Sequence, residues 1–126
     1  MLKVIEIAFS CYPVLDMPRA CAFYEGVLGL KKTMDHDMGE GKGHWVEFDI
    51  GAGTLSLGKY PGSKPTPDGC SVGLEVEDFD AAVKVIQDAG TKIVMGPFET
   101  PVCHMLIVND PDGNSLIIHK RKPGHS

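Results

Sequence analysis

The sequence predicts an α+β fold built from two tandem βαβββ modules, and two observations support this prediction. The order strand, helix, strand, strand, strand occurs twice, on either side of a segment rich in Pro and Gly. The start of the first helix, Val14-x-Asp16, also recurs as Val76-x-Asp78, 62 residues later, with an alanine four residues after each aspartate. Such a repeat indicates modules that cannot bury a sheet face alone and therefore share one interior, with the helices outside.

The elements of the first module follow from hydrophobic spacing. Residues 3–10 are rich in Val, Ile and Phe and predict a strand, which Tyr12-Pro13 should end because proline cannot donate to a strand ladder. Asp16 is a typical N-cap for a helix whose apolar residues recur every three or four positions, and Gly29 is a typical C-cap. The other elements expected here are strands at 30–34, 45–50 and 54–57, a polar loop at 35–43 and a glycine turn at 51–53.

A linker is expected between the modules, because residues 59–69 contain three Pro and two Gly and almost no apolar side chains. The pattern then repeats, with an alternating strand at 71–76, a helix from Asp78 to Gly90, and strands at 92–95, 102–108 and 114–119. The segment 110–113, DPDG, favours a tight turn between the last two strands. We therefore expect one domain over 1–126, with module one at about 3–58, the linker at 59–69 and module two at about 70–120.

Composition argues against several classes of partner. The chain has 17 acidic and 12 basic side chains, and the resulting net charge of −5 argues against nucleic-acid binding. Apolar stretches such as residues 105–108 are far shorter than the about 20 residues of a membrane span, and Lys3 and Glu6 interrupt any signal-peptide core. The four cysteines form no CxxC pair, which favours reduced thiols. We therefore expect a cytoplasmic protein with no nucleic-acid or membrane partner.

Two stretches resemble the vicinal oxygen chelate superfamily, which includes glyoxalase I, bleomycin-resistance proteins, fosfomycin-modifying transferases and extradiol ring-cleaving dioxygenases. Residues 14–30, VLDMPRACAFYEGVLGL, are similar to the pattern V-x-D, R-A, F-Y and L-G-L of that superfamily. Residues 110–116, DPDGNSL, are similar to the hairpin before its last strand. The resemblance covers residues 3–120 and implies a curved mixed sheet around a cleft, with the helices on the outside.

The resemblance also implies a divalent metal, held by His and Glu side chains from four strands, that would stabilise an enolate or oxyanion on the substrate. When the chain is aligned with the superfamily at the two motifs, the four metal-ligand positions correspond to Phe9, Ser56, Ser71 and Ile117. Phenylalanine and isoleucine offer no lone pair, and a neutral serine hydroxyl is a poor ligand beside imidazole or carboxylate. Shifting the alignment by one residue does not supply metal ligands either. The residues then at these positions would be Ala8, Ser10, Leu55, Leu57, Leu116 and Ile118. We therefore expect no metal and no cofactor, and a small organic ligand held as in bleomycin-binding proteins.

Strand alternation and alignment predict which side chains contact that ligand. If the leucines of the strands pack on the helices, the alternate residues face the cleft. His119 could then serve as hydrogen-bond donor, acid–base group or substitute metal ligand, or could simply bond to a neighbour at the strand end. Glu47 could be a buried base or a solvent-facing carboxylate, and Trp45 could stack on a planar ligand or pack in a core. The predicted ligand-binding residues are Phe9, Cys11, Trp45, Glu47, Ser56, Ser71, Ile117 and His119.

Two other classes of function stay open at this point. One is a metal-dependent lyase, isomerase or dioxygenase whose ligands have moved to Glu47, His119 and either His44 or His104. The other is a structural or regulatory protein without a ligand. A homodimer is expected in either case, because the first predicted strand is apolar on both faces and has more hydrophobic surface than one buried face requires. The resemblance implies the same, since modules from two chains often complete the cleft.

Overall fold

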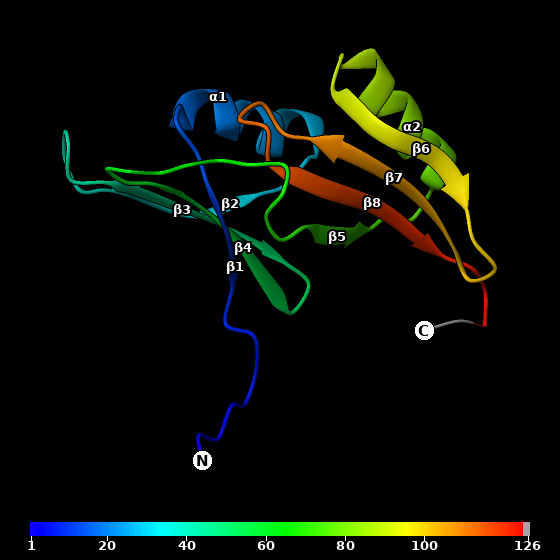
Figure 1. Cartoon of the computed structure of the whole chain (residues 1–126), viewed down its shortest axis with the longest axis horizontal. Coiled ribbons are helices and arrows are strands. Elements are labelled where there is room, and N and C mark those ends of the chain that lie inside the picture. The colour runs from blue at the N-terminus through cyan, green and yellow to red at the C-terminus, as the bar shows by residue number, and fades with distance from the viewer. Residues whose placement is uncertain (125–126) are drawn as a thin grey trace. The chain divides into compact units, whose positions relative to one another are not determined.

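The computed structural model describes residues 1–124 and contains two four-stranded mixed sheets with short helices (Figure 1). The chain divides into two compact units, which we call unit 1 (residues 1–64) and unit 2 (residues 65–124). Their border lies inside the segment 59–69 that was expected to be a linker. Each unit contains one strand, a helical segment and three further strands, so the predicted α+β fold with tandem βαβββ modules is confirmed.

Unit 1 has the strand order β1-β4-β3-β2. The edge strand β1 runs parallel to β4, and the other neighbours are antiparallel. The strands are β1 (Ser10–Pro13), β2 (Lys32–Asp37), β3 (His44–Ile50) and β4 (Gly53–Lys59).

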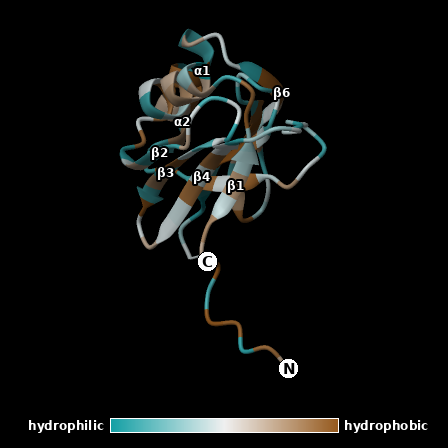
Figure 2. Cartoon of the chain, turned by 90° about the vertical axis from the view of Figure 1, so that its left-hand side faces the viewer, coloured by the Kyte–Doolittle hydropathy of each residue, from teal (hydrophilic) through white to brown (hydrophobic). Residues whose placement is uncertain are grey.

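The prediction of a strand at residues 3–10 is wrong for all but its last residue. Residues 1–9, which we call the N-terminal arm, have no regular secondary structure, and Ile5 and Ile7 are 85% and 86% exposed. Figure 2 shows the arm as a largely hydrophobic segment that extends away from the unit 1 sheet. The strand does end at Pro13, as predicted, and the missing N–H of this proline is tolerated because β1 is an edge strand. Hydrophobic composition alone therefore predicted a strand where the chain forms no backbone pairing.

The helical segment of unit 1 begins where the sequence predicts. The side chain of Asp16 accepts a hydrogen bond from the backbone N–H of Arg19 at 3.0 Å and caps α1 (Met17–Cys21). The helix continues as a π-helix, η1 (Ala22–Val27), in which the N–H of Leu28 donates to the carbonyl of Phe23. Gly29 follows with φ +71°, as expected for a C-cap.

The polar segment 35–43 is only partly a loop, which corrects the prediction. β2 starts at Lys32 rather than at residue 30 and continues to Asp37, which pairs with His44. Polar side chains are tolerated there because β2 is an edge strand with most of its residues exposed. The hairpin turn is therefore confined to residues 38–43.

Unit 2 has the corresponding strand order, β5-β8-β7-β6, with β5 parallel to β8. Asp78 caps α2 through a 3.0 Å bond from the N–H of Ala81. β6 continues past the predicted end at Met95 through two register shifts, which accommodate Gly96 at φ +99°. The elements are β5 (Val72–Glu75), α2 (Phe79–Asp88), β6 (Lys92–Glu99), β7 (Cys103–Asn109) and β8 (Ser115–Arg121).

The turn between β7 and β8 is held by the side chain of Asp110. Its Oδ1 accepts hydrogen bonds from the backbone N–H groups of Asp112 and Asn114, both at 2.9 Å. Gly113 has φ +93°, a conformation that glycine adopts without a steric penalty. The predicted tight hairpin is present.

Each unit buries one face of its sheet against its helical segment. In unit 1, the ring of Tyr24 stacks on Phe48 at 5.9 Å, and in unit 2 the buried Ile86 of α2 faces its sheet. We call the opposite face of each sheet the open face. The buried strand residues on the helical side include Val46, Phe48, Leu55 and Leu57 in unit 1 and Leu106, Val108, Leu116 and Ile118 in unit 2. Within residues 1–124, no helix has the length and apolar content needed to cross a bilayer.

Candidate functional site

One row of side chains crosses the open face of unit 1 and contains three of the predicted ligand-binding residues. Cys11 is in register with Ser56, Ser56 with Glu47, and Glu47 with Met34. Residues in register on neighbouring strands point to the same face of a sheet, so all four belong to the open face. The alternation of β3 and β4 therefore placed Glu47 and Ser56 on the same face, as predicted.

Three aromatic rings lie next to this row, and we call Phe9, Trp45 and Tyr60 the aromatic cluster. The ring of Trp45 lies 5.2 Å from that of Phe9 and 6.5 Å from that of Tyr60, at interplanar angles of 60° and 51°. The indole Nε1–H of Trp45 donates to Oε2 of Glu47 at 2.7 Å. This bond fixes the indole orientation and leaves one edge of the carboxylate unused.

Sequence reasoning missed Tyr60, because it lies in the segment expected to be a linker. The available signal was glycine at positions 43 and 58. A Cβ on Gly43 would lie 2.4 Å from the Tyr60 ring, and one on Gly58 would lie 3.1 Å from it. The ring thus occupies space that any larger residue at these positions would fill.

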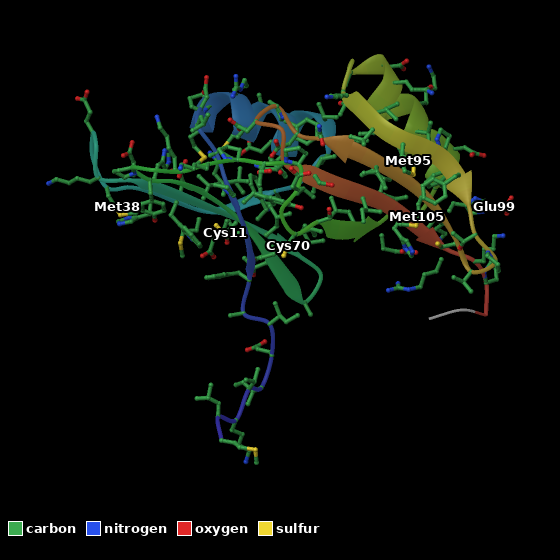
Figure 3. The ribbon with its side chains drawn as sticks, in the orientation of Figure 1. Cys11, Met38, Cys70, Met95, Glu99 and Met105 are labelled. Carbon is green, nitrogen blue, oxygen red and sulfur yellow. The ribbon has the colours of Figure 1, made fainter. Side chains whose placement is uncertain are left out.

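Ser56 and Cys11 differ from the rest of the row in accessibility. Ser56 is fully buried, and within residues 1–124 its hydroxyl has no hydrogen-bond partner. Cys11 (labelled in Figure 3) is exposed as a residue, but partial burial of its sulfur raises the pKa of the thiol. A thiol with a raised pKa supplies little thiolate at neutral pH and is a poor nucleophile.

The open face of unit 2 contains a histidine–carboxylate pair. His119 Nδ1 lies 2.5 Å from Oε1 of Glu75, its register partner, and Oε2 of Glu75 accepts the backbone N–H of Arg121 at 2.7 Å. Desolvation opposes ionisation of Glu75, but the hydrogen bonds from Arg121 and His119 outweigh it and lower the pKa of Glu75. His119 is therefore bonded to a neighbour at the strand end. Its partner was missed, because only the pairing of β5 with β8 brings the two side chains together.

The other two predicted residues of unit 2 have separate surroundings. The hydroxyl of Ser71 bonds to that of Ser115 at 2.7 Å, just before β5 begins. Ile117 is half-buried on the open face, in register with Gly73 and Ile107. Neither side chain contributes a charged group.

The side chains at the four ligand positions implied by the resemblance do not fit a divalent metal. The Phe9 ring packs on Trp45, Ser56 is sealed below the surface, Ser71 is bonded to another serine, and Ile117 has no donor atom. Within residues 1–124, no three His, Cys, Asp or Glu side chains gather in a group that could hold a metal ion.

His44 and His104, two of the three histidines considered as replacement ligands, point away from the open faces. His44 lies three positions before Glu47 on the same strand, hence on the opposite face, and its Nε2 lies 2.5 Å from Oδ1 of Asp35. His104 precedes Met105, the register partner of His119, and its ring packs on that of Phe79 at 5.4 Å on the helical side. Glu47 and His44 of unit 1 therefore lie on opposite faces of their sheet, and so do His119 and His104 of unit 2.

Comparison with known proteins gives concordant results. Residues 6–118 match the family described as the Glyoxalase/Bleomycin resistance protein/Dioxygenase superfamily. An uncharacterized protein of Mycolicibacterium smegmatis is 36% identical over 76 residues, which span 60% of this chain and 65% of that protein. Among solved structures, TnmS3, an antibiotic binding protein from a Streptomyces species, has a TM-score of 0.79 at 22% identity, covering 97% of this chain and 100% of its own. The trypanothione-dependent glyoxalase I of Leishmania major has a TM-score of 0.77 at 22% identity, covering 93% of this chain and 87% of its own.

Proposed function

Because this chain belongs to the Glyoxalase/Bleomycin resistance protein/Dioxygenase superfamily, we propose that it binds a small planar aromatic molecule on the open face of unit 1 without a metal ion. The observation that supports this proposal best is the aromatic cluster of Phe9, Trp45 and Tyr60. Three aromatic rings at stacking distances on one exposed face suit a flat ligand, because stacking adds to the free energy gained by burying apolar surface. The antibiotic-binding function stated for TnmS3, which has the same fold, is consistent with this class of ligand.

The carboxylate of Glu47 gives the proposed site its chemical preference. Oε2 accepts the indole N–H, and Oε1 has no hydrogen-bond partner within residues 1–124. A half-buried carboxylate oxygen with unused capacity favours a ligand that carries an N–H donor or a positive charge. The expected ligand is therefore a planar aromatic amine or cation.

The side chains at the four metal-ligand positions support the proposal that the ligand binds without a metal ion. The positions that correspond to the superfamily's metal ligands are Phe9, Ser56, Ser71 and Ile117, none of which is a competent ligand. One of them, Phe9, instead contributes a ring to the aromatic cluster.

Fluorescence titration tests this proposal directly, because Trp45 is the single tryptophan of the chain. Proflavine, a planar aromatic cation with amino donors, should quench Trp45 emission in a saturable way. Glu47→Gln should weaken binding about tenfold, roughly the value of one hydrogen bond to a charged group. Asp49→Asn is the matched control, since Asp49 lies two residues further along the same face of β3, and it should bind normally.

Three outcomes would count against parts of the proposal. Absence of saturable quenching by planar cations would refute the aromatic site. Equal affinity of the Glu47 and Asp49 variants would refute the role of Glu47. Loss of binding after treatment with a metal chelator would refute the metal-free part.

We also propose that the protein is a cytoplasmic homodimer in which both modules form one domain. The free thiols of Cys11, Cys21, Cys70 and Cys103 support a reducing compartment, and cell fractionation tests the location. The exposed apolar side chains of the N-terminal arm support a dimer, since a second copy would remove them from water.

A further inference from the structure

A groove of about 570 Å³ lies on the helical side of unit 1, opposite the open face. Met17 and Pro18 of α1 line one wall, and Tyr60 and Pro61 line another. The hairpin turn at residues 38–43, where Met38 is labelled in Figure 3, contributes three glycines with positive φ. The polar lining residues are Asp37, Glu40, His44 and Lys59. Apolar walls with a few polar groups are the usual composition of a small-molecule site.

His44, which lines this groove, is hydrogen-bonded to a carboxylate. His44 Nε2 lies 2.5 Å from Oδ1 of Asp35, and the other oxygen of Asp35 accepts from Lys32 Nζ at 3.0 Å. The hydrogen bond from His44 contributes most to lowering the pKa of Asp35, followed by that from Lys32. In the neutral imidazole, an ionised carboxylate beside Nε2 favours the tautomer with the proton on Nε2, which leaves the lone pair on Nδ1. Within residues 1–124, Nδ1 of His44 has no partner.

The charges around His44 limit which molecules suit the groove. On β2, Asp35 is already paired, whereas Asp37 and, in the turn, Glu40 add negative charge that disfavours a permanent anion. Lys59 of β4 supplies one positive charge, and α1 contributes only apolar contacts. A neutral ring that becomes negative only beside His44 and Lys59 satisfies these constraints.

We infer that this groove is a second ligand site, for a small phenolic molecule whose hydroxyl proton passes to Nδ1 of His44. In that step the O–H bond breaks, its electron pair stays on the oxygen, and an N–H bond forms on the imidazole. The resulting imidazolium is stabilised by Asp35, and the phenolate oxygen by Lys59. The ring packs on Pro18, Tyr60 and Pro61. This inference does not rest on the proposed open-face site, because His44 and Lys59 lie on the face of the sheet opposite Glu47 and the two sites have only Tyr60 in common.

The test uses para-nitrophenol with the full-length protein, at a pH where the free phenol is mostly protonated. Binding should generate the visible phenolate band, in a saturable way. His44→Gln should abolish that band and weaken binding about tenfold, roughly the value of one charge-assisted hydrogen bond. Asp35→Asn, which removes the carboxylate that fixes the tautomer, should reduce the band with the imidazole still present. His36→Gln is the matched control, since His36 lies on β2 and points to the other face, and it should behave as the wild type.

Each result decides the inference. A saturable phenolate band that His44→Gln and Asp35→Asn both diminish supports it, provided that circular dichroism shows both variants folded. Absence of the band in the wild type overturns it, as does an unchanged band in either folded variant. If His44→Gln fails to fold, Asp35→Asn and the His36→Gln control decide alone.

Discussion

A carboxylate paired with a nitrogen heterocycle occurs on the open face of each unit. In unit 1 the pair is Glu47 with Trp45, and in unit 2 it is Glu75 with His119. In both pairs the carboxylate holds the ring in one orientation, which lowers the entropic cost of using that ring as a contact surface. The residue types differ, so the two faces present different chemistry despite their common topology.

Glu75 should make stability depend on pH in the acid range. Its pKa is lowered in the folded protein, so the unfolded chain binds more protons than the folded chain between the two pKa values. The stabilisation is therefore present above the ordinary glutamate pKa and is lost as pH falls through the folded value. Glu75→Gln should cost about 0.5–1 kcal/mol at neutral pH, because the group is partly exposed, and nothing in strong acid. Urea unfolding at both pH values measures the difference.

Glu77 provides the control for this experiment. It is exposed, and within residues 1–124 it forms no hydrogen bond or ion pair. Glu77→Gln should therefore leave the free energy of unfolding unchanged at both pH values. A loss of stability in Glu75→Gln that persists in acid would show that packing, not ionisation, is responsible.

Single residues were predictable from the sequence to the extent that strand alternation determines their face. Alternation predicted that Trp45 and Glu47 share one face of β3. The DPDG sequence predicted the tight turn that the side chain of Asp110 holds. Glu75 was missed as the partner of His119, because parallel pairing joins residues 44 positions apart and leaves no local signal. Tyr60 was missed because its neighbours are mainly Pro, Gly and Lys, whose composition indicates a linker.

At the scale of elements, the turn between β7 and β8 is the clearest test of backbone conformation. Gly113→Val would force a β-branched residue into φ +93°, which costs about 1–3 kcal/mol. The melting temperature should fall accordingly. Gly73→Val is the control, since no atom lies within 4 Å of a Cβ at Gly73 and its φ is ordinary, so it should melt like the wild type. An unchanged melting temperature in Gly113→Val would contradict the role of the turn.

The contact between the hairpin turn and the aromatic cluster can be tested with a pair of glycine variants. Gly43→Ala places a Cβ 2.4 Å from the Tyr60 ring, so the ring must shift and its contact with Trp45 must change. We expect a shift in Trp45 emission and a loss of roughly 0.5–1.5 kcal/mol in proflavine binding, the value of one aromatic contact. Gly41→Ala also places an alanine at a positive φ, +75° against +128° at Gly43, but its Cβ meets nothing within 4 Å. Equal effects in both variants would exclude the Tyr60 contact as the cause.

Element boundaries were less predictable than element types. The apolar residues of the N-terminal arm carry the signature of a strand, yet β1 begins only at Ser10. The segment 35–37 carries the signature of a loop, yet it extends β2. In both cases the deciding factor is whether a neighbouring strand offers backbone partners, which composition does not encode.

For the whole molecule, the proposed homodimer predicts a specific response to charge in the arm. Sedimentation equilibrium at micromolar concentration should give about twice the chain mass of 13.6 kDa. Ile5→Asp, at a side chain that is 85% exposed, should shift the mass towards that of one chain. Val85→Asp introduces the same charge at an exposed apolar residue of α2 and should leave the dimer intact. A wild-type mass near 13.6 kDa would refute the dimer.

The proposal that both modules form one domain predicts a single unfolding transition. The only tryptophan and all three tyrosines, at positions 12, 24 and 60, belong to unit 1, so fluorescence reports that unit alone. Far-ultraviolet circular dichroism reports the strands of both units. The two signals should follow the same urea curve if the units unfold together. Separate midpoints would indicate two independent domains.

Tyr60 is shared by the two candidate sites of unit 1, since it lines the groove and its ring also contacts Trp45. Any displacement of this ring by a molecule in the groove would alter the surface presented to a molecule on the open face. By thermodynamic linkage the influence is mutual, so each occupant changes the affinity of the other by the same factor. A single side chain that directly follows β4 thus provides a route for communication across the thickness of the sheet.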